Sequence, residues 1–274
     1  DRAARPRPMM NSSAEPPSPA RVAPNAWHAF GGIWRLTFRR FLAPGYLLCV
    51  AGMLVVLAVP LNAIIQVSNP KFYFQWTSGF YLTFLVPILA FLSGAAGMRD
   101  EMKPEAVDYV LTRPVRRPLC LIFKFLSHLV CVQISYLLAL AVVIAVGLFR
   151  HIPLVLPALP WLLLGQVLTV TVFVAFGFLC GVLSARYLVI GLVYAGVVEF
   201  AIGSIPTQLS RLSMTHQVKM MLHPMLVWFT PALKPEQSVL TCVMVLLAFS
   251  VTMLAVAATV FSFQQLTGSR PNEG

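Results

Sequence analysis

The sequence predicts an all-α integral membrane protein, and three observations support this prediction. Of the 274 residues, 58% are hydrophobic and only 11% are charged, with a mean hydropathy of +0.81; a soluble domain has about 25% charged residues. Six apolar runs reach the length of about 20 residues that a helix needs to cross a bilayer. Lys and Arg collect on one side of these runs, so the net charge of +11 fits a membrane surface and requires no nucleic acid partner.

Residues 1–26 are rich in Pro, Ser, Ala and Arg, and they lack the apolar core of a signal peptide. We expect a disordered cytoplasmic tail here. Because Asp1 is not an initiator residue, the residues ahead of Met9 or Met10 are expected to be in part a processing or expression remnant.

Residues 27–42 predict an interfacial helix, because five aromatic side chains recur at helical spacing with arginines opposite or beside them. The aromatic residues are Trp27, Phe30, Trp34, Phe38 and Phe41, and the arginines are Arg35, Arg39 and Arg40. The alternative is a cytoplasmic extension of the first span. Pro44-Gly45 marks a break before the apolar run and favours the interfacial helix.

The transmembrane domain covers residues 43–265 and is followed by a cytoplasmic tail, 266–274. Its six expected spans are 45–66, 78–98, 119–149, 157–183, 187–206 and 238–263. The third is longer than the hydrocarbon layer requires and is expected to extend into the cytoplasm. The outer loop, 207–237, is too apolar for free water. It predicts a re-entrant segment of one or two short helices, interrupted at Pro224 and Pro231.

The orientation follows from the distribution of Lys and Arg. With both termini inside, eleven such residues outside the N-terminal tail lie on the inner side and five on the outer side. The inner residues are Arg35, Arg39, Arg40, Arg99, Lys103, Arg113, Arg116, Arg117, Lys124, Arg186 and Arg270, and the outer ones are Lys71, Arg150, Arg211, Lys219 and Lys234. Both termini are therefore expected to be cytoplasmic.

Several small residues predict close helix packing. Gly177 and Gly181 have GxxxG spacing, and Ser93-Gly94 lies inside an apolar run, where packing explains it better than its faint likeness to an ATP-binding cassette signature. The five cysteines (Cys49, Cys120, Cys131, Cys180 and Cys242) lack paired spacing, so they are interpreted as small buried hydrophobic residues. No phosphate-binding GxxxxGK[ST] loop occurs, so ATP is not expected to bind this chain by that route.

Glu199 is the only acidic residue well inside a predicted span. Burying a carboxylate is costly, so such residues usually face a cavity or a polar partner. Two interpretations stay open at this point. Glu199 lines a translocation path, or it bonds a neighbouring Tyr, Ser or Gln while protonated.

The outer segment 214–225 carries soft-metal ligand types. On one helix, His216, Met220 and His223 would share a face, and Met and His suit copper. Met214, Met221 and Met225 complete this set of weak candidates. The alternative is that the Met side chains face lipid while His and Lys reach water.

The segment 99–124 stands apart, because it holds four of the nine acidic residues and six of the twenty Lys and Arg. Within it, 104–112 predicts a short amphipathic helix that Pro104 opens and Arg113-Pro114 ends. A charged helix at the membrane surface is suited to contact with another protein.

This segment resembles the motif of ABC type-2 permeases, the membrane subunits of many bacterial ATP-driven exporters. Asp100 and Glu101 match the acidic stretch, Asp108, Tyr109 and Leu111 the helix, Pro114 and Arg117 the turn, and Lys124 the start of the third span. Glu105-Ala106 replaces the Gly-Thr of the family pattern. The wider resemblance covers residues 25–265: interfacial helix, six spans and re-entrant outer segment.

The resemblance implies that 104–112 is a coupling helix seated on a separate ATPase subunit. The implied coupling residues are Asp100, Glu101, Glu105, Asp108, Tyr109, Arg113, Pro114, Arg116 and Arg117. The inner turn 184–187, with Ser184 and Arg186, would be a second and smaller contact. Two permease copies, identical or paralogous, would pair over an ATPase dimer that binds ATP and Mg²⁺, so this chain is not itself expected to be an enzyme.

The implied location is the bacterial inner membrane, and the apolar outer part suits export of a hydrophobic, lipid-like or peptide substrate. Some relatives, such as the membrane subunit of the NosDFY copper-maturation system, instead serve an extracytoplasmic accessory protein, and the Met/His segment keeps that role open. An ion-coupled carrier is a further alternative. It would more often have several intramembrane charges or repeated halves.

Overall fold

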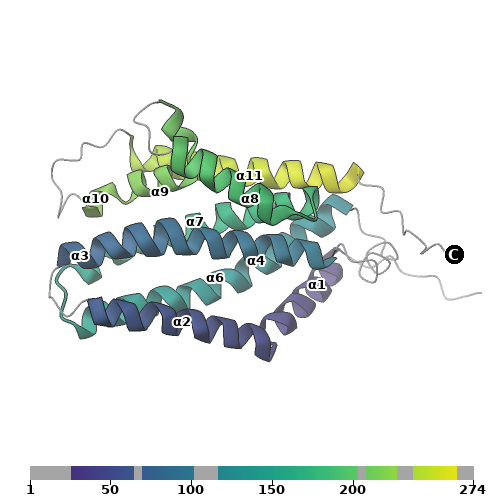
Figure 1. The fold of residues 1–274 in the computed structure, drawn as a ribbon. Helices are drawn as coiled ribbons and strands as arrows, with labels where there is room; N and C mark the ends of the chain where they lie inside the picture. Colours follow the sequence, from purple (N-terminus) through teal and green to yellow (C-terminus); the bar gives the residue numbers. More distant parts are fainter. Residues whose placement is uncertain (1–25, 65–69, 102–116, 203–207, 227–236, 264–274) are drawn as a thin grey trace, which may run out of the picture.

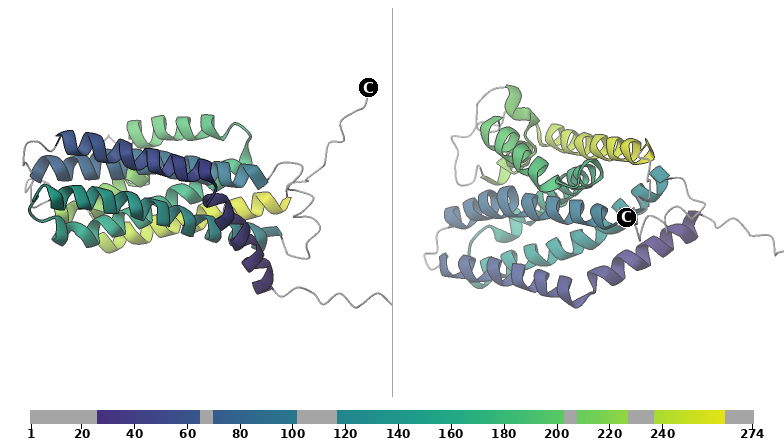
Figure 2. Two further views of the ribbon diagram at one scale, coloured as in Figure 1. Left: turned by 90° about the horizontal axis from the view of Figure 1, so that it is seen from below. Right: turned by 45° about the vertical axis from the view of Figure 1, so that its right-hand side comes forward.

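The computed structural model describes residues 26–64, 70–101, 117–202, 208–226 and 237–263, and every regular element in these ranges is a helix (Figure 1). The longest helices lie side by side in one bundle (Figures 1 and 2). The described part of the chain is therefore all-helical, as predicted. The coupling segment 104–112 and both terminal tails lie outside the described residues.

Four continuous helical stretches are long and apolar enough to cross a membrane: Pro70–Asp100, Pro118–Phe149, Val155–Leu183 and Val239–Phe263. They match the predicted second, third, fourth and sixth spans. The first of these is built from α3 (Pro70–Gln75), the π-helical η1 (Trp76–Leu85) and α4 (Val86–Glu101). It begins eight residues before the predicted start, because Pro70 opens the helix and Tyr73 and Phe74 are already fully buried.

Helix α1 (Ala26–Phe41) and helix α2 (Pro44–Ile64) form a bent pair. Their axes differ by 60° across the break before Pro44, and the pair counts as a fifth candidate span when taken together. The break falls where Pro44-Gly45 predicted it. Helix α1 leans away from the direction of α2 (Figure 2), with Arg35, Arg39 and Arg40 exposed.

The predicted fifth span lies only partly within the described residues. Helix α8 (Tyr187–Tyr194) continues into the π-helical η2 (Ala195–Ile202), and the apolar stretch of this pair, Tyr187–Glu199, is too short to count as a full span. Residues 203–206 lie outside the described part.

Helices α4 and α7 (Val155–Leu183) pack closely through small residues. A Cβ atom added at Gly177 would lie 2.4 Å from the Phe91 carbonyl oxygen, and one added at Gly181 would lie 2.8 Å from the Ala95 carbonyl oxygen. At Gly94 the added atom would lie 2.6 Å from the Val174 carbonyl oxygen. The packing role predicted for these glycines is confirmed, and the two backbones approach as in other membrane helix pairs.

Buried polar side chains also join the spans. The Tyr81 hydroxyl donates to the Gln166 side-chain oxygen at 2.6 Å, which links η1 to α7. The Tyr73 hydroxyl donates to the Val143 carbonyl oxygen of α6 (Arg117–Phe149) at 3.0 Å. Such bonds satisfy polar groups that have no water partner in the bilayer core.

The cysteine prediction is correct for three residues, holds in part for Cys120, which is half-buried, and is wrong for Cys49. All five thiols are free, and Cys131, Cys180 and Cys242 are buried. Cys49 is exposed, because it lies on a face of α2 that no described helix covers.

The helix ends divide into two groups at opposite ends of the bundle (Figure 1). One end has α1, the end of α4, the start of α6, the turn between α7 and α8, and the end of α11 (Val239–Phe263). The other end has the start of α3 and the short helices η3 (Gln208–Leu212), α9 (Met214–Met221) and α10 (His223–Leu226). Within the described residues, the Lys and Arg predicted to be inner lie at the first of these ends, and those predicted to be outer lie at the other.

Candidate functional site

A groove of about 720 Å³ lies between η1, α4, α7, α8 and the short helix α9. Its volume falls within the range of pockets that hold small-molecule ligands. The walls are mostly aliphatic and aromatic. The residues that line it are Gly79, Thr83, Phe84, Pro87, Ile88, Phe91, Leu92, Phe173, Phe176, Leu188, Gly191, Leu192, Tyr194, Ala195, Glu199, Thr215 and Lys219.

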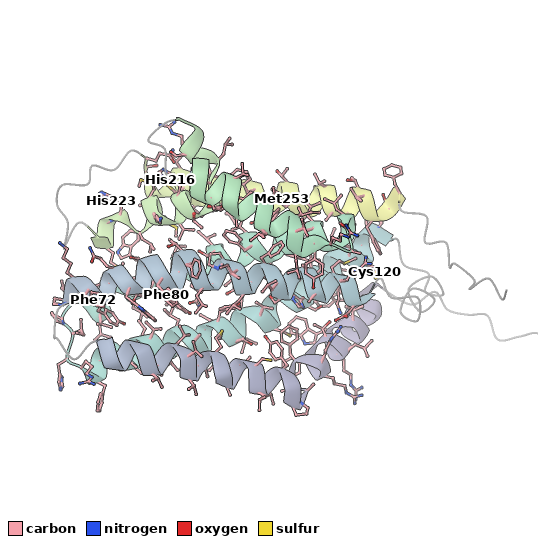
Figure 3. All side chains as sticks on the ribbon, viewed as in Figure 1. Phe72, Phe80, Cys120, His216, His223 and Met253 are labelled. Carbon is pink, nitrogen blue, oxygen red and sulfur yellow. The ribbon has the colours of Figure 1, made fainter. Side chains whose placement is uncertain are left out.

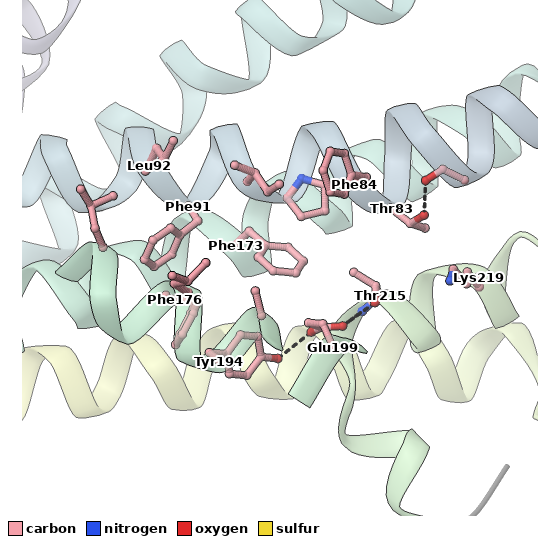
Figure 4. A pocket seen from close by; sticks show the side chains of 17 residues that line it. Thr83, Phe84, Phe91, Leu92, Phe173, Phe176, Tyr194, Glu199, Thr215 and Lys219 are labelled. Atoms are coloured by element: carbon pink, nitrogen blue, oxygen red, sulfur yellow. Dashed lines mark hydrogen bonds between the residues drawn. The ribbon is translucent and has the colours of Figure 1, made fainter. Parts of the chain in front are cut away.

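The groove is chemically asymmetric along its length (Figure 4). Phe91, Leu92 and Phe176 lie toward one end, whereas Thr215 and Lys219 lie toward the other. The apolar end is closer to the C-terminal ends of α4 and α7, and the polar end is closer to α9. The groove therefore offers an apolar slot with one charged end.

Glu199 occupies the polar end, and its carboxylate binds the start of α9. One oxygen, Oε1, accepts hydrogen bonds from the Tyr194 hydroxyl at 2.7 Å and from the Met214 backbone N–H at 3.1 Å. The other, Oε2, accepts from the Ser213 hydroxyl at 2.6 Å and from the Thr215 backbone N–H at 3.1 Å. The Thr215 hydroxyl also donates to Oε2. The carboxylate is thus fully used by donors from α8 and α9.

The local sequence explains why these groups meet. Ser213 is the N-cap of α9, and its hydroxyl oxygen accepts from the His216 backbone N–H at 3.0 Å. The N–H groups of Met214 and Thr215 have no partner within the helix, and a negative charge at a helix N-terminus is favourable. Glu199 supplies that charge from the preceding element. The sequence left two interpretations of Glu199 open, a position on a translocation path or a bond to a neighbouring Tyr, Ser or Gln. The structure contains bonds to Tyr194 and Ser213, and Glu199 also lines the groove.

Two π-helical segments flank the groove. Gly79, Thr83 and Phe84 come from η1, and Ala195 and Glu199 come from η2. The π-helix is rare and occurs frequently at functional sites. Both departures from α geometry thus occur where side chains converge on the groove.

The Met/His segment does not form the single helical face that its spacing predicted. Helix α9 ends at Met221 and a turn at Leu222 follows, so His223 begins a new helix and does not continue the face of His216 and Met220. Pro224 lies in the first turn of α10, where proline is tolerated, so the predicted interruption at Pro224 falls instead at Leu222. Figure 3 shows His216 and His223 on this outer segment, far from Cys120 at the start of α6.

The methionines of this segment face the protein interior. Met214, Met221 and Met225 are at most 1% exposed and belong to the hydrophobic core with α7 and α11. The expectation that the Met side chains face lipid is therefore wrong for these three. The expectation that His and Lys reach water is wrong for His223, which is buried, and correct for Lys219, which is exposed. Within the described ranges, no group of three His, Cys, Asp or Glu residues is placed to hold a metal ion.

The predicted coupling residues lie only partly within the described residues. Asp100 is near the end of α4 and forms an exposed ion pair with Arg40 of α1. Helix α4 ends at Glu101 and α6 begins at Arg117. Glu105, Asp108, Tyr109, Arg113, Pro114 and Arg116 lie outside the described part.

The predicted second inner contact is a tight turn between two helices. Ser184 follows the last residue of α7 in an extended conformation, and α8 begins at Tyr187. The Ser184 hydroxyl oxygen accepts from the Arg186 backbone N–H at 3.0 Å, which closes the turn. The Arg186 side chain is exposed and available to a partner.

Lys124, which the family resemblance places at the start of the third span, is buried beneath α1. Its ammonium lies 3.4 Å from the Thr37 hydroxyl oxygen, and Thr37 is in turn 3.3 Å from the Ser127 hydroxyl oxygen. All three side chains are at most 8% exposed. This polar contact joins α1 to α6 and holds the amphipathic helix against the bundle.

Comparison with known proteins assigns no family: no family model matches the chain, and none of the curated proteins is a significant match.

Sequence reasoning missed most of the groove. It selected Glu199, but it treated Lys219 only as one outer cation and gave no role to Thr83 or Tyr194. The available signal was the presence of polar residues inside otherwise apolar runs. Their convergence depends on the packing of α9 against the spans.

Proposed function

We propose that this chain is the transmembrane permease subunit of an ATP-binding cassette transporter, driven by a separate ATPase subunit and exporting a hydrophobic or lipid-like substrate. The proposal rests first on the 99–124 segment, whose charge and residue order resemble the coupling region of ABC type-2 permeases. The apolar helices provide a membrane domain for such a subunit.

The observation that carries the proposal is the connection between the groove and the proposed ATPase contacts. Helix α4 leads directly into the coupling segment, and α7 and α8 flank the turn at Ser184. The same three helices line the groove. Because α4 and α7 are in backbone contact at their glycines, a force applied at their inner ends would reach the groove walls through rigid helices.

The proposed mechanism needs a partner on the inner side. Closure of an ATPase dimer would move the 104–112 helix and the turn at Ser184 together. The groove would then open alternately to the inner and the outer side of the membrane. ATP and Mg²⁺ would bind only the partner. The groove supports this proposal over the copper-maturation alternative, since it offers a defined ligand site, whereas His216 and His223 of the Met/His segment lie on separate helices.

Gentle purification of the tagged chain from its native host tests the proposal. An ATP-binding cassette protein is expected to co-purify in a fixed stoichiometry. The Asp108→Arg variant is expected to lose it, because charge reversal opposes a charge-assisted interface. The Arg211→Asp variant reverses a charge on the opposite side and serves as the matched control. Recovery of wild-type chain without any ATPase would contradict the proposal.

A further inference from the structure

We propose that the groove binds one anionic phospholipid, with an acyl chain along α4 and α8 and the headgroup at Lys219. The lipid class follows from the groove itself. The inference that this lipid is the transported substrate rests on the proposed function.

The apolar part of the groove fits an acyl chain. Its lining outside the polar end is aliphatic or aromatic, and Gly79 leaves the wall without a side chain at one point, whereas the Phe91 ring packs against Gly191. Gly79 and Leu92 are thirteen residues apart along η1 and α4, which corresponds to at most about 20 Å, the length of thirteen residues of α-helix. One leaflet of the hydrocarbon core is about 15 Å thick. The slot is therefore long enough for a lipid tail in one leaflet.

The groove is also open to the side where lipid would lie. Ile88 on α4 is 41% exposed, and Leu192 on α8 is 75% exposed, so both edges of the groove have exposed apolar side chains. In water these surfaces would be unfavourable. In a bilayer they would allow a chain to enter sideways from the acyl region.

The polar end favours a negative headgroup. Glu199 contributes a negative charge, but its two oxygens are engaged by five donors, four of them at the N-terminus of α9, whose dipole offsets that charge. Among the described residues no carboxylate forms an ion pair with Lys219, and its side chain is exposed at the groove. The ammonium thus remains as a positive group that can bind a phosphate oxygen.

The location agrees with this assignment. Lys219 belongs to α9, which lies at the end of the bundle opposite the C-terminal ends of α4 and α7 (Figures 1 and 4). In the predicted orientation this is the outer side. The headgroup would lie at the outer interface, with the acyl chain pointing toward the bilayer centre.

A lipid-binding measurement on the purified full chain tests the inference. The chain in phosphatidylcholine nanodiscs is titrated with fluorescent phosphatidylglycerol, and fluorescent phosphatidylcholine provides the comparison. We expect saturable binding of one phosphatidylglycerol per chain. Lys219→Gln should weaken it about tenfold or more, because it removes a charge-assisted bond. Lys219→Arg should retain it.

A second pair of variants fills the groove. Gly79→Trp should abolish binding without distorting the helix, since no atom lies within 4 Å of a Cβ added there. Gly52→Trp is the matched control, because that glycine of α2 is equally uncrowded and does not line the groove. Arg211→Gln is the control for removal of an outer cation outside the groove.

Two results would overturn the inference. The first is equal binding of the two lipids with no effect of Lys219→Gln. The second is that Gly79→Trp changes the oligomeric mass of the chain but leaves lipid binding unchanged. That result would assign the groove to contact with a second copy of the chain. These outcomes are separable from failure of the proposed function. Selective lipid binding without a co-purifying ATPase contradicts only the transporter proposal. A co-purifying ATPase without selective lipid binding contradicts only the lipid site.

Discussion

Replacing Glu199 by Gln is expected to loosen the outer segment while leaving the spans in place. The substitution keeps the size of the side chain and removes one acceptor oxygen. In either amide orientation, the new NH₂ group faces one of two backbone N–H groups, that of Met214 or that of Thr215. Both groups lie at a helix N-terminus, where no intrahelical partner exists.

The expected cost follows from these bonds. An orphaned buried N–H costs about 1–3 kcal/mol, and loss of the negative charge at the start of α9 costs about 0.3–1 kcal/mol more. The hydroxyls of Tyr194 and Ser213 can rotate to accept from the new amide, so they add little. We therefore expect a loss of about 1–4 kcal/mol in the free energy that holds α9 in place.

Hydrogen exchange measured peptide by peptide is the appropriate assay. Exchange over Met214–Met221 should accelerate at least severalfold in Glu199→Gln, since each 1.4 kcal/mol corresponds to about tenfold. Exchange in α6 should not change. Asp100→Asn is the matched control, because it neutralises an acid that lies outside the groove. Unchanged protection of α9 in Glu199→Gln would refute the anchoring role.

Three further results are expected. Gly177→Leu should destabilise the protein by about 1–3 kcal/mol in thermal unfolding, because its side chain would overlap the α4 backbone, whereas Gly52→Leu should have little effect; equal melting temperatures would contradict the close packing. Asp100→Asn should change the melting temperature little, since exposed ion pairs contribute about 0–1 kcal/mol, and a large loss would show that the pair has a greater role. Deletion of 104–112 should preserve membrane insertion but abolish ATPase association, as measured by fractionation and co-purification; retained association would exclude the coupling role.

Features that depend on local sequence were the most predictable. Four spans matched long apolar runs, the break before α2 fell at Pro44-Gly45, and the packing glycines were recognised from GxxxG spacing. Each of these signals lies within one helix. The ends were less accurate, as at Pro70, where buried aromatic side chains extend the helix through a more polar stretch.

Features that depend on contacts between distant elements were not predictable from the sequence. Gly79 and Lys219 are 140 residues apart, yet both line the groove. Glu199 stood out as an acid in an apolar run, but no pattern indicated that its partner is the start of α9. The burial of Met214 and Met221 has the same origin, since their spacing fits a lipid-facing surface as well as a core.

Site-specific cross-linking to the ATPase tests the central claim most directly. A photoreactive amino acid is placed at position 108, at 185 in the inner turn, or at 211 on the opposite side, and the chain is illuminated in cells of its native host. We expect an ATP-binding cassette protein to be captured from 108 and 185 and not from 211. Capture from 211, or from none of the three positions, would contradict the assignment of this chain as an ATPase-driven permease.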